Sequence, residues 1–339
     1  MTASAAPVEN RGSWRLLALG LFVFVFAWRV PQLRLMLPIE QTTLLLVPMI
    51  AVCAIVGWRH GGNVWLALGA IVLSLALLFL GGATPASSYH WMVQGWVLLL
   101  SASFGLVSIF APAEPFFPRA LGALGVATAI AFSLVLLSSG GPARVGSVMS
   151  AELNRRRDEG ITALREAQEQ PGVKQAVEKY PALGSVYDSN EAQIEAIPAW
   201  SAPLLPALLA LESLIAMALG WALYHRAGGR AVGPVLSKLR NFTFNDQLIW
   251  GVAVGASIYL LPSFTDGKAA GLNLLVFFGA LYVVRGLGVL AWMRRGRAQT
   301  WILIGIAIVA PPVIPAIAFG LGLGDTWLDW RTRLQPRAS

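Results

Sequence analysis

The sequence predicts an all-α protein, a polytopic transmembrane helical bundle of eight or nine spans with a short helical extracytoplasmic excursion. Two observations predict this class. Of the 339 residues, 56% are hydrophobic and only 12% are charged, whereas about a quarter of the residues of a typical soluble domain are charged. The apolar residues also occur in uncharged runs long enough to cross the roughly 30 Å hydrocarbon core of a bilayer. A water-soluble protein is therefore excluded.

The spans are predicted from apolar runs of about 17 to 25 residues. Tryptophan supports the assignment, because an indole favours the boundary between headgroups and hydrocarbon. Trp14, Trp58, Trp221 and Trp301, for example, lie close to a predicted end. The nine predicted spans are 14–32, 42–58, 64–81, 91–111, 119–138, 203–224, 247–264, 269–293 and 300–322.

Basic residues in short loops predict the orientation, because such loops stay in the cytoplasm. The loops 225–246 and 294–299 are rich in Lys and Arg, and 82–90 has neither. We therefore expect a cytoplasmic N-terminus and an uncleaved first span. Nine crossings place the basic tail outside, which conflicts with the rule that basic segments stay in the cytoplasm. Interruption of the last span by its three prolines would return the tail to the cytoplasm, so eight and nine crossings both stay open. The prolines are Pro311, Pro312 and Pro315.

One region differs in composition from the rest. Residues 139–202 contain seven Lys or Arg and nine Asp or Glu, and we expect two or three short amphipathic helices on the outer face. This excursion is either a cap over an extracytoplasmic cavity or a connector resting on its own bundle. The predicted regions are an N-terminal membrane region, the excursion, a C-terminal membrane region and a basic and aromatic tail, at 1–138, 139–202, 203–323 and 324–339.

Two ionisable side chains lie well inside the predicted spans, Glu212 and Arg285. Each costs about 2.5–3.5 kcal/mol on insertion scales, so such residues face the protein interior and find partners. One hypothesis is a buried ion pair, or a polar site that both line, with Asn273 as a further ligand-binding candidate. The alternative is that Arg285 extends to the cytoplasmic boundary and Glu212 is protonated or faces a water-filled cleft.

Signatures of catalysis and of metal binding are missing. One cysteine and three scattered histidines provide no metal cluster, so we expect no metal and no cofactor. Gly322-Leu323-Gly324-Asp325 is similar to the motif of intramembrane aspartyl proteases, but no span supplies the second aspartate that such a dyad needs. We expect no enzyme. The triplet 155–157 is followed by Asp158 and Glu159, which favours a solvated helix face over a nucleic-acid site.

Several landmarks in order resemble the YybS-like family of predicted bacterial membrane proteins. They include Gly57-Trp58-Arg59-His60-Gly61, Pro203-Leu204-Leu205-Pro206-Ala207, Asn273-Leu274, Arg285-Gly286-Leu287 and the closing Gly324-Asp325-Thr326-Trp327-Leu328-Asp329-Trp330-Arg331. The resemblance implies a bacterial cytoplasmic membrane protein. It singles out Arg59, His60, Asp325, Asp329 and Arg331 as motif residues. His60 is also interpreted as the cap of a tight turn, and the tail residues as anchors at the membrane boundary.

The family is distantly similar to the S components of energy-coupling-factor transporters, chiefly in its first segments. The span 14–32 lacks the Ala-x-x-x-Ala pattern that meets the coupling subunit in those proteins. The leading interpretation is a protein of the lipid bilayer that binds or translocates a small molecule. The competing interpretation is a non-transporting scaffold or regulatory subunit that docks a membrane partner. No nucleic-acid partner is expected.

Overall fold

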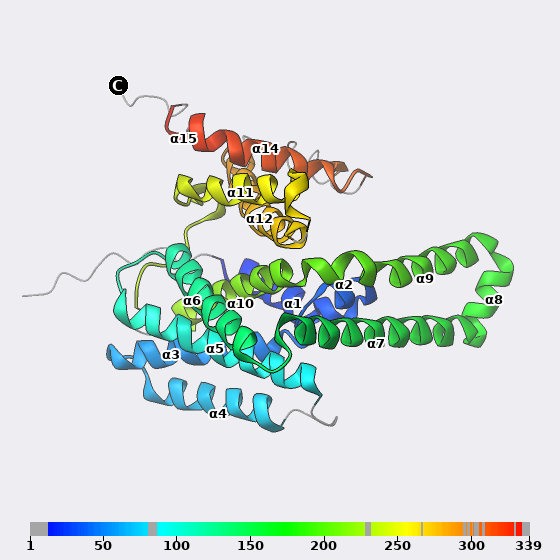
Figure 1. The fold of residues 1–339 in the computed structure, drawn as a ribbon, viewed down its shortest axis with the longest axis horizontal. Coiled ribbons are helices and arrows are strands. Elements are labelled where there is room, and N and C mark those ends of the chain that lie inside the picture. The colour runs from blue at the N-terminus through cyan, green and yellow to red at the C-terminus, as the bar shows by residue number, and fades with distance from the viewer. Residues whose placement is uncertain are drawn as a thin grey trace, which may run out of the picture. The chain divides into compact units, whose positions relative to one another are not determined.

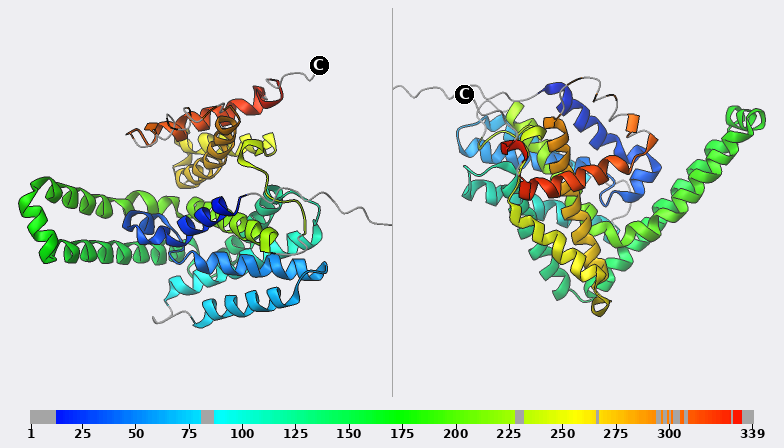
Figure 2. Two further views of the ribbon diagram at one scale, coloured as in Figure 1. Left: turned by 180° about the vertical axis from the view of Figure 1, so that it is seen from behind. Right: turned by 90° about the horizontal axis from the view of Figure 1, so that it is seen from above.

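The computed structural model is helical in every regular element that it describes, and its chain divides into two compact units, Met1–Leu236 and Ser237–Ser339. Figures 1 and 2 show these elements. The described residues are 13–80, 87–227, 232–265, 267–293, 296, 299, 301, 305–306, 309–328 and 330–333.

The first helix of unit 1 is shorter than the predicted span 14–32. Helix α1 (Trp14–Phe26) passes into a 3₁₀ turn, Ala27–Arg29, and the short helix α2 (Pro31–Met36) follows. Val30 has extended backbone angles (φ −90°, ψ 117°), as expected of a residue that precedes proline. Pro31 starts α2, where its missing N–H costs nothing. The continuous 19-residue helix was therefore a wrong prediction.

The next four helices agree closely with the prediction. They are α3 (Thr43–Arg59), α4 (Val64–Leu80), α5 (Ser88–Phe110) and α6 (Phe116–Leu137). Helix α3 packs against α4 and α5, and α5 packs against α6 (Figure 1). The turn after α3 has Gly61 at φ +87°, a conformation that glycine adopts without strain.

The charged region forms a long helical hairpin rather than a group of short helices. Helix α7 (Gly141–Glu169) has 29 residues, which corresponds to about 43 Å at 1.5 Å per residue. The small helix α8 (Pro171–Lys179) turns the chain into α9 (Pro181–Ser201), and the hairpin extends away from the other helices of unit 1 (Figure 2). Ion pairs between residues four apart on α7 support its length.

Helix α9 leads through a 3₁₀ turn, Ala202–Leu204, into α10 (Leu205–Ala227). Pro198 lies inside α9 without ending the helix. Helix α10 packs against α1, α3 and α6, and twelve of its residues are buried. It is the central helix of unit 1.

The described residues of unit 2 include three apolar helices. Helix α11 (Ile249–Leu260) has 12 residues instead of the 18 of the predicted span 247–264, because Leu261 is extended and Pro262 starts a 3₁₀ turn. Helix α12 (Lys268–Met293) agrees with its predicted span. Helix α14 (Val313–Leu328) begins after a turn at Pro311 and Pro312, so the prolines do interrupt the predicted span 300–322. The short helix α15 (Trp330–Arg333) follows.

In the described part of the chain, four helical stretches are long and apolar enough to cross a membrane. Shorter apolar helices there are Thr43–Arg59, Val64–Phe79 and Val313–Leu328. These lengths support an all-helical membrane protein, while the count of eight or nine spans stays a prediction. The long stretches are Ser88–Phe110, Phe116–Leu137, Pro181–Ala227 and Lys268–Met293.

Candidate functional site

Arg285 on α12 is at the centre of a buried polar cluster in unit 2. Its Nε donates to Oδ2 of Asp325 on α14 at 2.9 Å, and Nη1 donates to Oδ1 of Asp246 at 2.6 Å. Nη2 donates to the backbone carbonyl of Asp325 at 3.3 Å. The ring of Phe244 lies 5.2 Å from the guanidinium carbon. Arg285 is therefore fully engaged inside its own unit.

A second arginine, Arg331 of α15, contacts the same carboxylate. Its Nη2 donates to Oδ2 of Asp325 at 2.6 Å, and its Nη1 donates to the carbonyls of Arg240 and Phe242 at 3.2 and 2.9 Å. Asp325 is only 2% exposed. A carboxylate between two guanidinium groups is stabilised as a counter-ion, which is the opposite of the shared proton of an aspartyl dyad.

This cluster unites residues that the sequence placed in two groups. Arg285 was a ligand-binding candidate, and Asp325 and Arg331 belonged to the closing motif. With two arginines and two aspartates the cluster has no formal net charge, and its geometry ties α12, α14, α15 and the segment around Asp246 together. Asp329 of the same motif lies outside the described residues.

Glu212 has a different environment, in unit 1. It is 3% exposed on α10, and its Oε2 accepts from the backbone N–H of Ile39 at 3.0 Å. Its Oε1 is buried without a hydrogen-bond partner. Within the described part of the chain, Glu212 forms no ion pair with Lys, Arg or His. The expected pairing partner, Arg285, has partners of its own in unit 2.

A cavity of about 590 Å³ lies beside Glu212. One face of α1, one face of α10 and the segment from α2 to Pro38 line it, and Glu212 is its one charged lining residue. The α10 residues that line it are spaced three and four apart, as one face of a helix requires. Leu16, Leu19 and Val23 are more than half exposed, so the cavity is open along α1. The lining residues of α10 are Leu208, Leu211, Glu212 and Ile215.

The segment Leu37, Pro38, Ile39 and Glu40, which we call the strap, separates this cavity from the hairpin. Arg156 of α7, only 2% exposed, donates from Nη1 to the carbonyl of Leu37 at 2.7 Å and from Nη2 to that of Pro38 at 3.5 Å. Tyr89 also bonds to the carbonyl of Pro38. The strap is therefore held by Arg156 on one side and by Glu212 on the other.

Glu152 neutralises part of the charge of Arg156. Its Oε1 accepts from Nε of Arg156 at 2.8 Å and from Nη2 of Arg155 at 2.6 Å. Burial alone would raise the pKa of Glu152, but the hydrogen bonds and charges of the two arginines hold that pKa below its usual value. Glu152 thus stays ionised at neutral pH.

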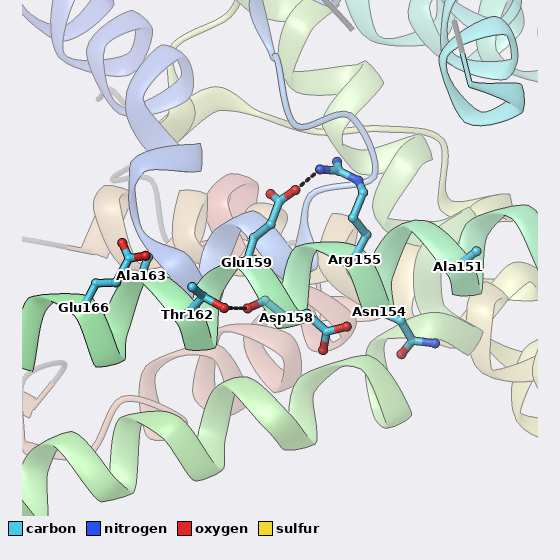
Figure 3. A pocket seen from close by; sticks show the side chains of 8 residues that line it. All are labelled: Ala151, Asn154, Arg155, Asp158, Glu159, Thr162, Ala163 and Glu166. Carbon is cyan, nitrogen blue, oxygen red and sulfur yellow. Dashed lines mark hydrogen bonds and ion pairs between the residues drawn. The ribbon is translucent and has the colours of Figure 1, made fainter. Parts of the chain in front are cut away.

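The neighbouring face of α7 is an open, charged surface. Figure 3 shows a shallow depression there, lined by residues of this one helix, with Arg155 directed at Glu159 and the Thr162 hydroxyl donating to the backbone carbonyl of Asp158. Its polar groups bond to each other, pair with neighbouring side chains such as Arg34 and Glu152, or are exposed to solvent. We therefore do not regard it as the candidate site.

The remaining candidates from the sequence lie apart from the cavity. Arg59 and His60 are exposed at the end of α3. The backbone N–H of His60 donates to the carbonyl of Gly57 at 3.0 Å, which confirms that His60 caps a tight turn. Asn273 donates to the carbonyl of Ala269 on its own helix at 2.7 Å.

Sequence reasoning missed the roles of two arginines. Arg156 was interpreted as part of a solvated triplet, and Arg119 was not singled out, yet each is at most 2% exposed. Arg119 donates from Nη2 to the carbonyls of Ala111, Pro112 and Glu114 and stacks on Trp221 at 4.5 Å. The position of Arg119 inside an apolar helix is the signal that could have identified it.

No group of His, Cys, Asp or Glu in the described residues has the geometry to hold a metal ion.

Comparison with known proteins gives one match. Residues 158–326 match the model of a family of predicted membrane proteins, DUF2232. The match covers about half of the chain, from the middle of α7 to the Asp325 cluster, and it supports a membrane protein of unknown function. No curated protein and no solved structure matches the chain.

Proposed function

We propose that unit 1 binds a small amphiphilic molecule in the α1/α10 cavity, with a cationic amine head at Glu212 and an apolar body against α1 and α10. The observation that carries the proposal is the buried Oε1 of Glu212, which has no partner beside an otherwise apolar cavity. A buried charge without a partner is costly. An ammonium group supplies both the missing hydrogen bond and the missing positive charge.

The size and shape of the cavity support a small ligand. About 590 Å³ lies within the usual range for small-molecule sites, which combine apolar walls with a few polar groups. The opening along α1 supports entry from the hydrocarbon of a bilayer. We further propose the bacterial cytoplasmic membrane as the location, with a cytoplasmic N-terminus and the hairpin outside. The resemblance of the N-terminal region to substrate-binding S components agrees with a ligand-binding role.

Titration with dodecylamine tests the proposal. The protein is placed in phosphatidylcholine nanodiscs, and bound amine is measured by native mass spectrometry, with dodecanol as the uncharged analogue. Glu212→Gln keeps the size of the side chain but removes the charge, and should weaken amine binding at least about 30-fold, since loss of one partner of a buried charge pair costs about 2 kcal/mol or more. Glu195→Gln, on the exposed face of α9, is the matched control.

Dodecanol binding should differ little between Glu212→Gln and wild type. Equal amine binding by wild type and Glu212→Gln would refute the proposal. A further arm replaces dodecylamine by phosphatidylethanolamine, because a lipid headgroup and a free amine present the same chemistry. Retention of the lipid alone would identify the bilayer as the source of the ligand.

The competing function, a scaffold that docks a membrane partner, makes a different prediction in the same experiment. A scaffold has no need of a charged group at the cavity, so the amine and the alcohol should bind equally weakly to wild type and to Glu212→Gln.

A further inference from the structure

We propose that Arg156 is a positioning residue for the Glu212 cavity, so that attachment of the α7–α9 hairpin and occupation of the cavity are linked. This inference rests on the proposed function, because it concerns control of the same site. The hairpin carries no residue of the cavity wall. Its influence passes through the strap, Leu37 to Glu40.

Arg156 uses all of its donors at this position. An arginine side chain has five N–H groups. The Nε donates to Glu152, Nη1 donates to the carbonyls of Arg34 and Leu37, and Nη2 donates to the carbonyl of Pro38 and to Oη of Tyr89. Three of these acceptors are backbone carbonyls at the end of α2 and in the strap. No other side-chain type offers this fork of donors.

The strap also forms part of the ligand site. Leu37 and Pro38 line the cavity, and the N–H of Ile39 fixes Oε2 of Glu212. Three successive residues thus connect Arg156, the apolar wall and the carboxylate. A shift of the strap that breaks the Arg156 contacts would therefore move the wall and release Oε2 of Glu212.

The connection has a thermodynamic consequence. If the hairpin holds the strap in the binding-competent position, a bound ligand must in turn stabilise the attachment of the hairpin, because linkage between two sites is reciprocal. The stability of the hairpin attachment would then depend on whether the cavity is occupied, and a molecule that contacts the outer part of the hairpin could respond to this change.

The arginine triplet provides a matched control one residue away. Among the described residues, Arg157 pairs only with Asp158, at 2.8 Å, and is partly exposed. Arg155 is half exposed and pairs with Glu152 and Glu159, but it also lies 4.0 Å from Glu40 of the strap, so it is no control. The positioning role requires that Arg156→Met affects the cavity and that Arg157→Met does not.

The test combines dodecylamine titration with hydrogen–deuterium exchange in phosphatidylcholine nanodiscs. In wild type, dodecylamine should slow exchange at the Ile39 amide and in α7 around Arg156. Arg156→Met should weaken amine binding about tenfold, within the usual range of coupling between sites, and abolish the response of α7. Arg156→Lys should recover part of both, since it keeps the charge but fewer donors. Arg157→Met should behave as wild type.

Two results would overturn the inference. One is that Arg156→Met binds dodecylamine with wild-type affinity, and the other is that dodecylamine does not change hydrogen–deuterium exchange in α7 of wild type. The second result is obtained on wild type alone, so the inference can be refuted even if Arg156→Met misfolds. If wild type binds no amine, the proposed function fails by itself. Ligand-free exchange at Ile39 then decides on positioning: faster exchange in Arg156→Met than in Arg157→Met supports it, and equal exchange refutes it.

Discussion

Arg285 of α12 and Asp325 of α14 form a buried ion pair, with 2.9 Å between Nε and Oδ2, that joins two apolar helices of unit 2. Arg331 contacts the same carboxylate at 2.6 Å. One aspartate therefore contacts two guanidinium groups that are each less than a tenth exposed. The pair explains why an arginine is tolerated in the middle of an apolar helix.

Substitution Asp325→Asn should destabilise unit 2 strongly. It leaves Arg331 without its carboxylate partner and Arg285 with only the exposed carboxylate of Asp246, and removal of one partner of a buried pair costs about 3–5 kcal/mol. Thermal unfolding of the detergent-solubilised protein measures the effect. Asp246→Asn is the control: its side chain is 59% exposed although it also pairs with Arg285, so a loss of about 1 kcal/mol or less is expected. Similar losses for both variants would contradict the account.

A close approach of α12 and α14 makes a second prediction. A Cβ at Gly286 would overlap the backbone carbonyl of Ala318, and one at Gly322 would overlap that of Tyr282. Gly286→Ala should therefore force the helices apart and destabilise unit 2 by about 1–3 kcal/mol. Gly320 on the same helix as Gly322 has nothing within 4 Å of an added Cβ, and Gly320→Ala should not destabilise. The unfolding temperatures of the two variants test this prediction: a lower value is expected for Gly286→Ala and an unchanged one for Gly320→Ala, and equal values would contradict it.

The attachment of the hairpin should weaken in acid. Because the folded-state pKa of Glu152 lies below its usual value of 4.5, its contribution to stability is complete above about pH 4.5 and is lost as the pH falls through the folded-state pKa. Limited proteolysis of α7 from pH 7 to pH 3 should show increased cleavage only at the acid end. Glu152→Gln should be cleaved more readily at neutral pH and show less change in acid. An unchanged acid response in Glu152→Gln would contradict this.

Much of the fold follows from apolar run length. Helices α3, α4 and α12 begin and end within a residue or two of their predicted spans, because uncharged runs leave little choice of boundary. The failures occur where proline acts locally: Pro31 and Pro262 each start a new element and shorten the preceding helix. The length of α7 was missed, since short helices were expected in this region, whereas its ion pairs four residues apart favour a continuous helix.

The site was predictable only in part, for a physical reason. Rarity of charge identifies Glu212 and Arg285, since each violates the apolar composition around it. It cannot identify their partners, which are set by packing across long stretches of chain: Ile39 is 173 residues from Glu212, and Asp325 is 40 residues from Arg285. Arg156 is the opposite case: it lies among charged residues in the sequence, which suggested an exposed side chain, but it is buried.

Labelling by dicyclohexylcarbodiimide, an apolar reagent that adds to carboxyl groups in apolar surroundings, tests the Glu212 cavity most directly. The protein in phosphatidylcholine nanodiscs is treated with and without dodecylamine, digested and analysed by mass spectrometry. The account predicts an adduct on Glu212, protection by dodecylamine, no protection by dodecanol, and loss of this adduct in Glu212→Gln. Absence of the Glu212 adduct, or labelling that dodecylamine does not reduce, would contradict it.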